Sequence, residues 1–339
     1  MAEAVNVEGI MSAIGRTRPA VALTAMLALG IASEAAQAQT YPSKPIRIVV
    51  PYAPGGITDV IARALGQRLS ETWKQQVVVE NKPTGAGIVG IESVAKAAPD
   101  GHTLLVGADA AFVTAPHTYS KLPYDPIRDF VPITGLGISP QALVVHPSVP
   151  VRTLADLIAL AKTKPGEINY GTFGIGTSGH LNIVLIESLT GTKFTPVHYR
   201  GATPALTDTI AGHIQMLIVS IGLVAQPWQA GQLKVLGFGS TARLPQFPDT
   251  PTLAESGLPG YEAGSWYGLV APKDTPREIV DKLNAETRRI FNDPQFRERL
   301  LEPSFIYSIV SSPEEFAERI RRDSDKWGKV IREANIKAE

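Results

Sequence analysis

Five short segments rich in glycine and hydroxyl side chains stand where a predicted strand gives way to a predicted helix. They cover residues 51–59, 81–87, 107–111, 171–180 and 199–205. Glycines allow backbone N–H groups to face outward at a helix N-terminus, where unpaired donors and the helix dipole favour an anion. The pattern predicts an anion site. Each segment alone also fits a plain turn, in the first case one whose Thr58 or Asp59 caps the following helix.

The fourth segment contains a literal G-x-G-x-x-G, which raises the possibility of a dinucleotide site. Such a site needs an acidic residue about 20 positions further on to hold a ribose hydroxyl. No Asp or Glu lies between Glu187 and Asp208, so dinucleotide binding is not supported. The hydroxyl groups of the segment suit direct carboxylate recognition instead. They belong to Thr172, Thr177 and Ser178.

Groups that catalyse reactions or bind metals are poorly represented. The chain has no cysteine, no H-E-x-x-H and no G-K-[ST], and its six histidines show no spacing typical of metal ligands. Ser178 lacks the second glycine of a G-x-S-x-G elbow. We therefore expect no catalytic residue, metal or cofactor, and the alternative is a hydrolase that uses Ser178 or His180. The side chain of Arg200, in the fifth segment, could either pair with a substrate anion or lie in solvent.

Strands and helices alternate along the part of the chain that positions these segments. Two α/β lobes with mainly parallel sheets follow from repeated strand, turn and helix patterns. Strands are predicted at 46–50, 77–80, 103–107, 142–145, 196–199, 216–219 and 234–239, and helices at 59–72 and 180–189. Helix caps are predicted at Thr153, Thr275 and Ser312, each followed three residues later by an acidic side chain.

Composition excludes several other classes of protein. The 339 residues carry 32 basic and 32 acidic side chains, so the chain lacks the positive charge that a whole-chain grip on nucleic acid requires. A hydrophobic content of 44% is that of a globular protein. At this length two domains are expected.

The first 38 residues have the pattern of a cleaved signal peptide. Arg16 and Arg18 precede the apolar run 20–32, and the sequence Ala-Gln-Ala at 36–38 suits signal peptidase. Translation from Met11 is an alternative start. The apolar run is too short to span a bilayer core of about 30 Å, so we expect an exported protein without a membrane anchor. The lack of thiols suits an oxidising periplasm.

Motifs along the whole mature chain resemble those of the Bug-type receptors of tripartite tricarboxylate transporters. Their order and spacing match from the first glycine segment to the last. The matching segments are PYAPGGxxD at 51–59, ENKP at 80–83, PDGHTL at 99–104, YRGxxPA at 199–205, PDxPTxxExG at 248–257 and SWYGLxAP at 265–272.

This resemblance implies a periplasmic binding protein fold, with two α/β lobes closing over a small carboxylate in the cleft between them. Lobe one would comprise 39–140 plus 265–339, and lobe two 141–264. The receptor would act as a monomer, would not be an enzyme and would bind no nucleic acid. It would deliver its ligand to the membrane permease subunits of the transporter.

The resemblance also implies which residues surround the ligand. Backbone amides and bridging waters of the glycine segments hold the carboxylate in such receptors. The candidate ligand-binding residues are Tyr52, Pro54, Gly55, Gly56, Thr58, Asp59, Gly85, Ala86, Gly87, Asp109, Ala110, Thr172, Gly176, Thr177, Ser178, His180, Tyr199, Gly201, Ala202, Val219 and Ser220.

Two departures from the family pattern bear on the ligand. The second glycine segment reads Pro-Thr-Gly-Ala-Gly at 83–87, where the family often has Pro-Gly-Ala-Gly-Gly. Gln215 and Val219 stand where the family usually carries Asp. Because a buried ammonium needs a paired carboxylate, a plain mono- or dicarboxylic acid, aromatic or aliphatic, is favoured over an amino acid.

Overall fold

The computed structural model describes residues 41–83, 87–199 and 201–337. The predicted signal peptide, Arg200 and the candidate residues Gly85 and Ala86 lie outside these ranges. Residues 44–339 form one compact unit, which contains all the elements discussed below. None of the described helices is both long and apolar enough to cross a membrane.

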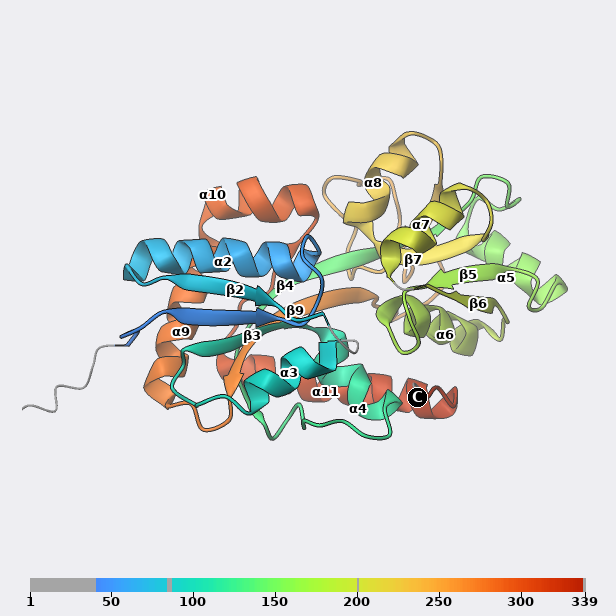
Figure 1. The fold of residues 1–339 in the computed structure, drawn as a ribbon. Coiled ribbons are helices and arrows are strands. Elements are labelled where there is room, and N and C mark those ends of the chain that lie inside the picture. The colour runs from blue at the N-terminus through green and yellow to red at the C-terminus, as the bar shows by residue number, and fades with distance from the viewer. Residues whose placement is uncertain (1–40, 84–86, 200, 338–339) are drawn as a thin grey trace, which may run out of the picture. The chain divides into compact units, whose positions relative to one another are not determined.

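One extended sheet runs through this unit in the order β2-β1-β3-β9-β4-β7-β5-β6, with β8 and β10 also paired to β4 (Figure 1). The strands that the sequence predicts are present with boundaries shifted by at most one residue, except that 142–145 is the end of a much longer strand. The strands are β1 Ile46–Val50, β2 Val77–Asn81, β3 Thr103–Ala108, β4 Phe130–Val145, β5 Asn169–Thr172, β6 Thr195–His198, β7 Met216–Ser220, β8 Lys234–Phe238, β9 Gly264–Pro272 and β10 Tyr307–Ser308.

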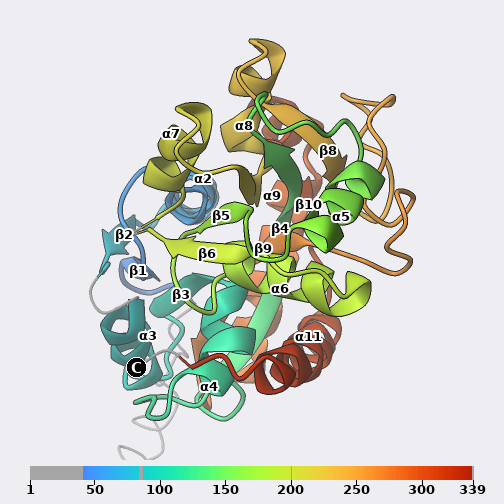
Figure 2. The same cartoon turned by 90° about the vertical axis from the view of Figure 1, so that its right-hand side faces the viewer.

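Helices cover both faces of the sheet, and α2 and α3 lie on opposite faces of β1 to β3 (Figures 1 and 2). The longer helices are α2 Ile57–Trp73, α3 Ile88–Ala95, α5 Leu154–Thr163, α6 Ser178–Thr190, α7 Ala202–Ile210, α8 Ile221–Gln229, α9 Arg277–Asn292 and α11 Pro313–Glu333. Short turns of helix are η2 Ala110–Thr114, α4 Ala115–Thr118, α10 Pro294–Phe296, η3 Arg297–Leu301 and η4 Glu302–Ser304.

Strand β4 is shared by the two parts of the sheet. Its residues 130–140 pair with β9, and its residues 141–145 pair with β7. The predicted parallel pairings are present, since β1 lies parallel to β2 and β3, and β5 to β6 and β7. Both β4 and β9 run antiparallel to their neighbours, so the sheet is mixed. The change of partner after Pro140 matches the predicted lobe boundary, which remains a prediction.

Two of the three predicted helix caps are confirmed. The hydroxyls of Thr153 and Ser312 each accept the backbone N–H three residues on. In return, their own backbone N–H groups donate to the carboxylates of Asp156 and Glu315, which completes two capping boxes. The cap predicted at Thr275 is wrong. Pro276 is the N-cap of α9, and the Thr275 hydroxyl donates to the Pro272 carbonyl, which ends β9. The Thr275 hydroxyl is therefore directed back to β9 and not to the first turn of α9, unlike Ser312, which caps α11 in front of Pro313.

An aromatic cluster fixes η2 against the sheet. Phe112 stacks on Trp266 of β9 with ring centroids 5.9 Å apart, and Phe316 of α11 meets the same indole edge-on at 5.4 Å. All three side chains are buried. Burial of rings of this size contributes roughly 1.5 to 3 kcal/mol each. The cluster therefore holds η2 rigidly as one wall of the cavity described next.

Candidate functional site

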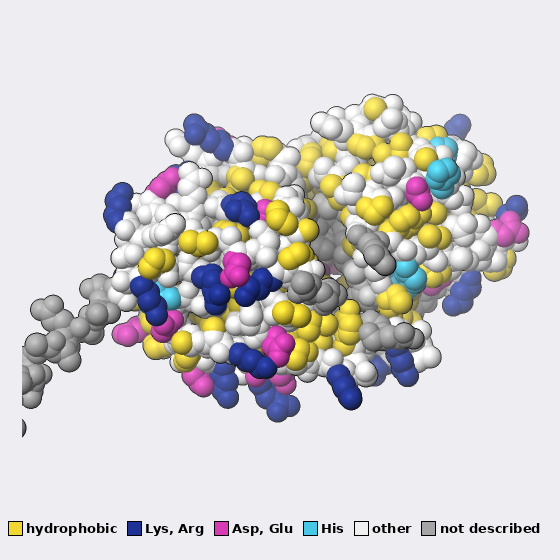
Figure 3. All heavy atoms as spheres, viewed as in Figure 1, with side chains coloured by type: hydrophobic (Ala, Val, Ile, Leu, Met, Phe, Trp, Pro, Cys, Tyr) yellow, Lys and Arg dark blue, Asp and Glu magenta, His cyan; other side chains and the backbone are white. Residues whose placement is uncertain are grey.

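A cavity of about 430 Å³ lies where the loops after β1, β2, β3 and β5 meet the start of α7. The space-filling view shows a hollow in the middle, between the part built on β1 to β3 and the part built on β5 to β7 (Figure 3). The structure brings together six of the predicted residues as lining of this cavity. They are Tyr52, Gly87, Ala110, Gly176, Thr177 and Gly201.

Three helices begin at residues that line the cavity. The N-cap residues are Gly87 for α3, Thr177 for α6 and Gly201 for α7, and none of the three makes a side-chain cap hydrogen bond. The Thr177 hydroxyl donates to the Gly174 carbonyl at 2.7 Å. The first-turn amides of these helices therefore have no side-chain acceptor from their own caps, and the positive ends of three helix dipoles meet at one cavity.

Backbone geometry requires glycine at one of these positions. Gly87 has φ of +86°, and a Cβ there would lie 2.7 Å from the Pro51 carbonyl oxygen. An L side chain would therefore be strained and would also clash with the loop after β1. The close approach of two loops explains why the second glycine segment ends on this residue.

The loop after β1 is shaped by Asp59. Its carboxylate accepts hydrogen bonds from the Gly55 N–H at 2.9 Å, from Arg63 Nε at 3.0 Å and from Asn81 Nδ2 at 2.9 Å. Burial opposes these bonds, yet the pKa of Asp59 is lowered from its usual value. Asp59 is buried and fully bonded within the protein, so it positions the loop. Residues 51–53 line the cavity, whereas Gly55 and Gly56 are exposed beyond its edge.

Two histidines hold the loop after β5 through hydrogen bonds with residues of that loop. The Thr172 hydroxyl lies 2.7 Å from His198 Nδ1, and the Gly176 N–H donates to His180 Nδ1 at 3.2 Å. Burial, followed by the nearby His198, lowers the pKa of His180 to about 4. His180 is therefore neutral at physiological pH, and because Nδ1 accepts, its proton is on Nε2.

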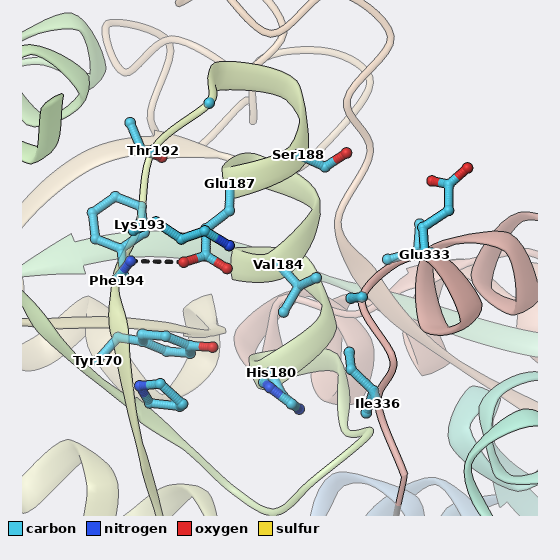
Figure 4. Close-up of a pocket in the computed structure, with 14 residues that line it drawn as sticks. Tyr170, His180, Val184, Glu187, Ser188, Thr192, Lys193, Phe194, Glu333 and Ile336 are labelled. Atoms are coloured by element: carbon cyan, nitrogen blue, oxygen red, sulfur yellow. Dashed lines mark hydrogen bonds between the residues drawn. The ribbon is translucent and has the colours of Figure 1, made fainter. Parts of the chain in front are cut away.

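His180 lines a second pocket of about 520 Å³ on the other side of α6 (Figure 4). The pocket lies between α6 and the end of α11, and Tyr170, Glu187 and Ile336 also border it. One Glu187 oxygen accepts the Phe194 N–H at 2.7 Å, and burial raises the pKa of this carboxyl. His180 therefore supports the cavity loop from behind, since its ring does not line the cavity.

The Ser178 side chain does not line the cavity. It belongs to a partly buried network of polar side chains. Its hydroxyl accepts from Gln141 Nε2 at 2.8 Å and lies 3.0 Å from the Ser265 hydroxyl. Gln141 Oε1 in turn accepts from Asn182 Nδ2 at 2.7 Å. Ser220 makes a similar contact, 2.6 Å from the Ser139 hydroxyl. These bonds join β4 to α6, β7 and β9 close to where β4 changes partner.

Asp109 directly precedes the lining residue Ala110 but does not itself line the cavity. Its carboxylate accepts the Ala110 N–H at 2.8 Å, which caps η2, and its side chain is buried. Burial raises the pKa of Asp109 to about 7, and the charge of Asp323 acts in the same direction. Burial and the neighbouring Asp109 also raise the pKa of Tyr52, whose hydroxyl thus remains protonated.

The remaining predicted residues do not line this cavity. Tyr199 turns toward α7, where its hydroxyl donates to Asp208 at 2.6 Å. Val219 is buried in β7 opposite Ala142. The described candidates outside the lining are Pro54, Gly55, Gly56, Thr58, Asp59, Asp109, Thr172, Ser178, His180, Tyr199, Ala202, Val219 and Ser220.

Much of the cavity wall comes from residues that sequence reasoning did not select. No helix is predicted from the sequence at 110–118, and the structure forms η2 and α4 there. The apolar residues of this segment, which includes Pro116, have no clear helical period. Only the position of the segment directly after a predicted strand indicates that it could border a ligand site. The missed lining residues include Ile88, Ile91, Thr114, Thr118, Tyr119, Tyr124, Phe173 and Ile175.

The arrangement offers neither a nucleophile nor a metal site within the described chain. The Ser178 hydroxyl is bonded to Gln141 and Ser265, and His180 Nδ1 is occupied by a backbone amide. No cluster of three potential ligands among the described residues could hold a metal ion. What the site can do is bind an anion reversibly at helix N-termini.

An α/β chain with such a cavity between two parts of its sheet has the fold of periplasmic solute-binding proteins. The family model described as "Tripartite tricarboxylate transporter family receptor" matches residues 61–336. The chain belongs to this family of solute receptors, as its motifs predict.

Individual relatives agree with this assignment. A Pseudomonas protein described as the UPF0065 protein in the tcbD-tcbE intergenic region is 37% identical, covering 96% of each chain. Protein BugT of Bordetella pertussis is 32% identical over 88% of this chain and 92% of its own length. Among solved structures, R. palustris Rpa4515 with adipate has a TM-score of 0.79 at 33% identity, covering 88% of this chain and 99% of that one. MatC from Rhodopseudomonas palustris with bound malate has a TM-score of 0.75 at 30% identity, covering 86% and 100%.

Proposed function

We propose that the protein is a periplasmic receptor that captures a small carboxylate and delivers it to the permease of a tripartite tricarboxylate transporter. The observation that carries this proposal is the convergence of three helix N-termini without side-chain caps on one cavity. Structures of two relatives, described with adipate and with malate, support a carboxylate as ligand.

The carboxylate is held chiefly by backbone amides. At the start of α6, the amides of Ser178 and Gly179 follow the lining residue Thr177. They precede the first intrahelical donors, because His180 N–H and Leu181 N–H both donate to the Thr177 carbonyl. A ligand oxygen placed at this turn accepts from donors that the chain leaves available. Hydrogen bonds to a charged group contribute about 1.5 to 3 kcal/mol each.

Closure of two lobes around the ligand is part of the same proposal. Lobe one comprises 39–140 plus 265–339, and lobe two comprises 141–264. Strands β4 and β9 connect them, and the Gln141, Ser178 and Ser265 bonds lie at this connection. Export by the predicted signal peptide at 1–38, a monomeric state and contact with the permease subunits complete the proposed function.

A hydrolase acting in the same cleft is the competing function, and the contacts of Ser178 and His180 argue against it. Incubation of the protein with its best ligand separates the two. We expect quantitative recovery of the unchanged acid by chromatography. Protein-dependent conversion that disappears in Ser178→Ala would favour the hydrolase.

A thermal-shift screen of residues 39–339 against a library of small acids tests the receptor function. A ligand that binds only the native state at about 100 times its Kd stabilises by roughly 2.7 kcal/mol. We expect at least one carboxylate to raise the melting temperature by several degrees, while its primary amide does not. Stabilisation by sugars or amines, with none by any acid, would reject a carboxylate receptor.

A further inference from the structure

The loop after β5 comes close to α4 at Gly176. Both Gly176 and Thr118 of α4 line the cavity. A Cβ added to Gly176 would lie 2.8 Å from Thr118 Cγ2 and 3.4 Å from the Thr118 hydroxyl oxygen. Gly176 also has φ of +74°, a conformation that L side chains rarely adopt. Glycine is therefore required here for the loop to approach α4 so closely.

This contact joins parts of the chain that the proposed function assigns to different lobes. Thr118 falls in the proposed lobe one, and Gly176 falls in the proposed lobe two. The cavity is lined by Gly87 from the first of these lobes and by Thr177 and Gly201 from the second. The arrangement in which Gly176 meets Thr118 is thus also the one in which three uncapped helix starts share a cavity. Under the proposed function, this is the arrangement that binds the carboxylate.

Hydrogen bonds fix the α4 side of the contact. The Thr118 side chain is buried, and its hydroxyl donates to the Thr114 carbonyl at 3.1 Å. The neighbouring His117 Nε2 lies 2.9 Å from the Ser324 hydroxyl, which anchors α4 to α11. Helix α4 therefore presents a fixed surface, and the position of the loop decides whether the contact forms.

The loop side of the contact depends on His180. The Gly176 N–H donates to His180 Nδ1 at 3.2 Å, and the imidazole is only 8% exposed. Its ring packs against Tyr170 and His198, with ring centroids 6.4 Å and 5.3 Å away (Figure 4). His180 lies in the first turn of α6, whose N-cap Thr177 lines the cavity. The hydrogen bond therefore ties the glycine of the contact to the helix start that faces the ligand.

Resting on the proposed function, we propose that His180 is a positioning residue for ligand capture. It holds the Gly176 N–H and thereby keeps the loop after β5 in contact with Thr118, in the arrangement that binds the carboxylate. His180 itself does not touch the ligand. Without the Nδ1 acceptor the loop leaves this position, and ligand binding must restore it. The Kd then rises in inverse proportion to the population of the binding arrangement.

Two substitutions of His180 separate the acceptor from the ring. His180→Phe keeps an aromatic ring and removes the acceptor, whereas His180→Asn loses the ring and keeps an oxygen acceptor on Cγ, in the place of Nδ1. The probe for calorimetry is the acid that gives the wild type its largest thermal shift, with adipate and malate measured alongside. We expect the Kd to rise at least about tenfold in His180→Phe and at most about threefold in His180→Asn.

Equal affinities of the Phe and Asn variants would overturn the positioning role and leave the receptor function intact. Failure of the wild type to bind any acid of the thermal-shift library would instead reject the receptor function, and this inference with it.

His146→Phe is the matched control for His180→Phe. Nδ1 of His146 accepts the Ser148 N–H at the same distance of 3.2 Å, and His146 does not line the cavity. We expect the Kd of His146→Phe to stay within about twofold of wild type. An equal rise in the two Phe variants would mean that loss of such a bond weakens binding wherever it occurs, which contradicts a specific role of His180.

A double-variant cycle tests the contact itself and decides the question if His180→Phe does not fold. Gly176→Ala places a methyl group against Thr118 Cγ2, and Thr118→Ser removes that Cγ2 while it keeps the hydroxyl. We expect Gly176→Ala to raise the Kd about tenfold, and the double variant to regain at least about threefold of this loss. Independent effects of the two substitutions would show that the loop and α4 do not meet in the binding arrangement, and would overturn the proposal.

Discussion

Two groups of helices in this protein treat their N-terminal amides in opposite ways. Helices α5 and α11, away from the cavity, carry complete capping boxes from Thr153 and Ser312. Helices α3, α6 and α7 begin at the cavity with no side-chain cap. Helices α2, α8 and α9 also begin without a side-chain cap, so α3, α6 and α7 are distinguished by N-cap residues that line the cavity, where their first-turn donors are available to an anion. The unpaired backbone N–H groups at a helix start can therefore either be capped by a side chain or bind a ligand anion.

The short helix η2 is an intermediate case. It faces the cavity through Ala110, yet Asp109 caps it with a carboxylate. Burial raises the pKa of that carboxylate to about 7, so the cap is partly protonated at neutral pH. Asp109, which adjoins the lining residue Ala110, therefore carries less negative charge than the sequence suggests, and this limits its repulsion of an anionic ligand.

The largest expected effect comes from Gly87→Ala, which changes an uncapped helix start. The left-handed backbone costs an L residue about 1 to 2 kcal/mol, and the contact with the Pro51 carbonyl adds roughly 1 to 3 kcal/mol. We expect the free energy of unfolding, measured by denaturant titration, to fall by about 3 kcal/mol. Carboxylate binding should also be lost.

Gly191→Ala is the matched control for Gly87→Ala. Gly191 ends α6 with φ of +66°, and a Cβ there meets no atom within 4 Å. The free energy of unfolding should therefore fall by only about 1 kcal/mol, the cost of the left-handed backbone, and ligand affinity should not change. Similar losses of stability in both variants would mean that the contact between the loops after β1 and β2 contributes nothing.

Asp109→Asn tests the carboxylate cap of η2 through the pH dependence of protein stability. The folded protein binds the Asp109 proton up to about pH 7, whereas the unfolded chain releases it near pH 4. The native state thus binds more protons between these values, so the wild type loses stability as pH rises through this window. We expect the stability of Asp109→Asn relative to wild type to grow by roughly 2 to 3 kcal/mol from pH 5 to pH 8. A constant difference would show that Asp109 is ionised throughout.

His180→Gln should show a pH dependence of opposite sign. The pKa of His180 falls to about 4 in the folded protein, so the unfolded chain binds more protons between about pH 4 and 6.5. Acidification therefore destabilises the wild type through this group, by roughly 2 kcal/mol at pH 5. The variant should lack this loss when its urea unfolding is compared with wild type at pH 8 and pH 5. An identical loss in both proteins would contradict the burial of a neutral imidazole.

Ser312→Ala removes a complete cap from α11 and should have a smaller effect. Loss of such a cap costs about 1 kcal/mol. We expect a lower urea midpoint and no change in the Kd of the best carboxylate from the screen. A change in Kd would mean that α11 capping and the cavity are coupled, and the division between the two groups of helices would fail.

Lys82→Ala should have the smallest effect on ligand binding. Its ammonium donates to the Ser93 hydroxyl at 3.3 Å and pairs with Glu80 at 3.4 Å, so its charge is partly neutralised within the protein. We expect less than a twofold change in Kd by calorimetry. A collapse of binding would show that charge pairing, and not the helix N-termini, captures the anion.

Local sequence patterns predicted most of the elements. Strands such as Ile46–Val50 and caps such as Ser312 depend on neighbouring residues, which a pattern records directly. The first part of β4 and the whole of β9 were not predicted as strands. Both contain glycine or proline within the strand and are held by pairing with each other, which is information that no single segment carries.

The site was predicted less completely than the fold. Gly87, Gly176 and Gly201 of the predicted glycine segments line the cavity, and these segments could be found because a helix N-terminus has a local signature. Their contact with a ligand stays a prediction. Whether a hydroxyl faces the ligand depends on its other partners, and Ser178 is bonded to Gln141, 37 positions away. The apolar wall carries no motif at all, since residues such as Ile91 are indistinguishable in sequence from the core.

The pairing of β9 with β3 has a consequence for how the chain reaches its fold. Strands β4 to β8 all lie between these two partners in the sequence. The edge of β3 therefore stays open until synthesis has passed Pro272, and closing so long a loop is slow because its entropy must be lost before the pairing is gained. We expect refolding from urea to be slower than in proteins of local topology. For the export proposed above, this topology leaves the sheet of a newly made chain open until β9 has been synthesised.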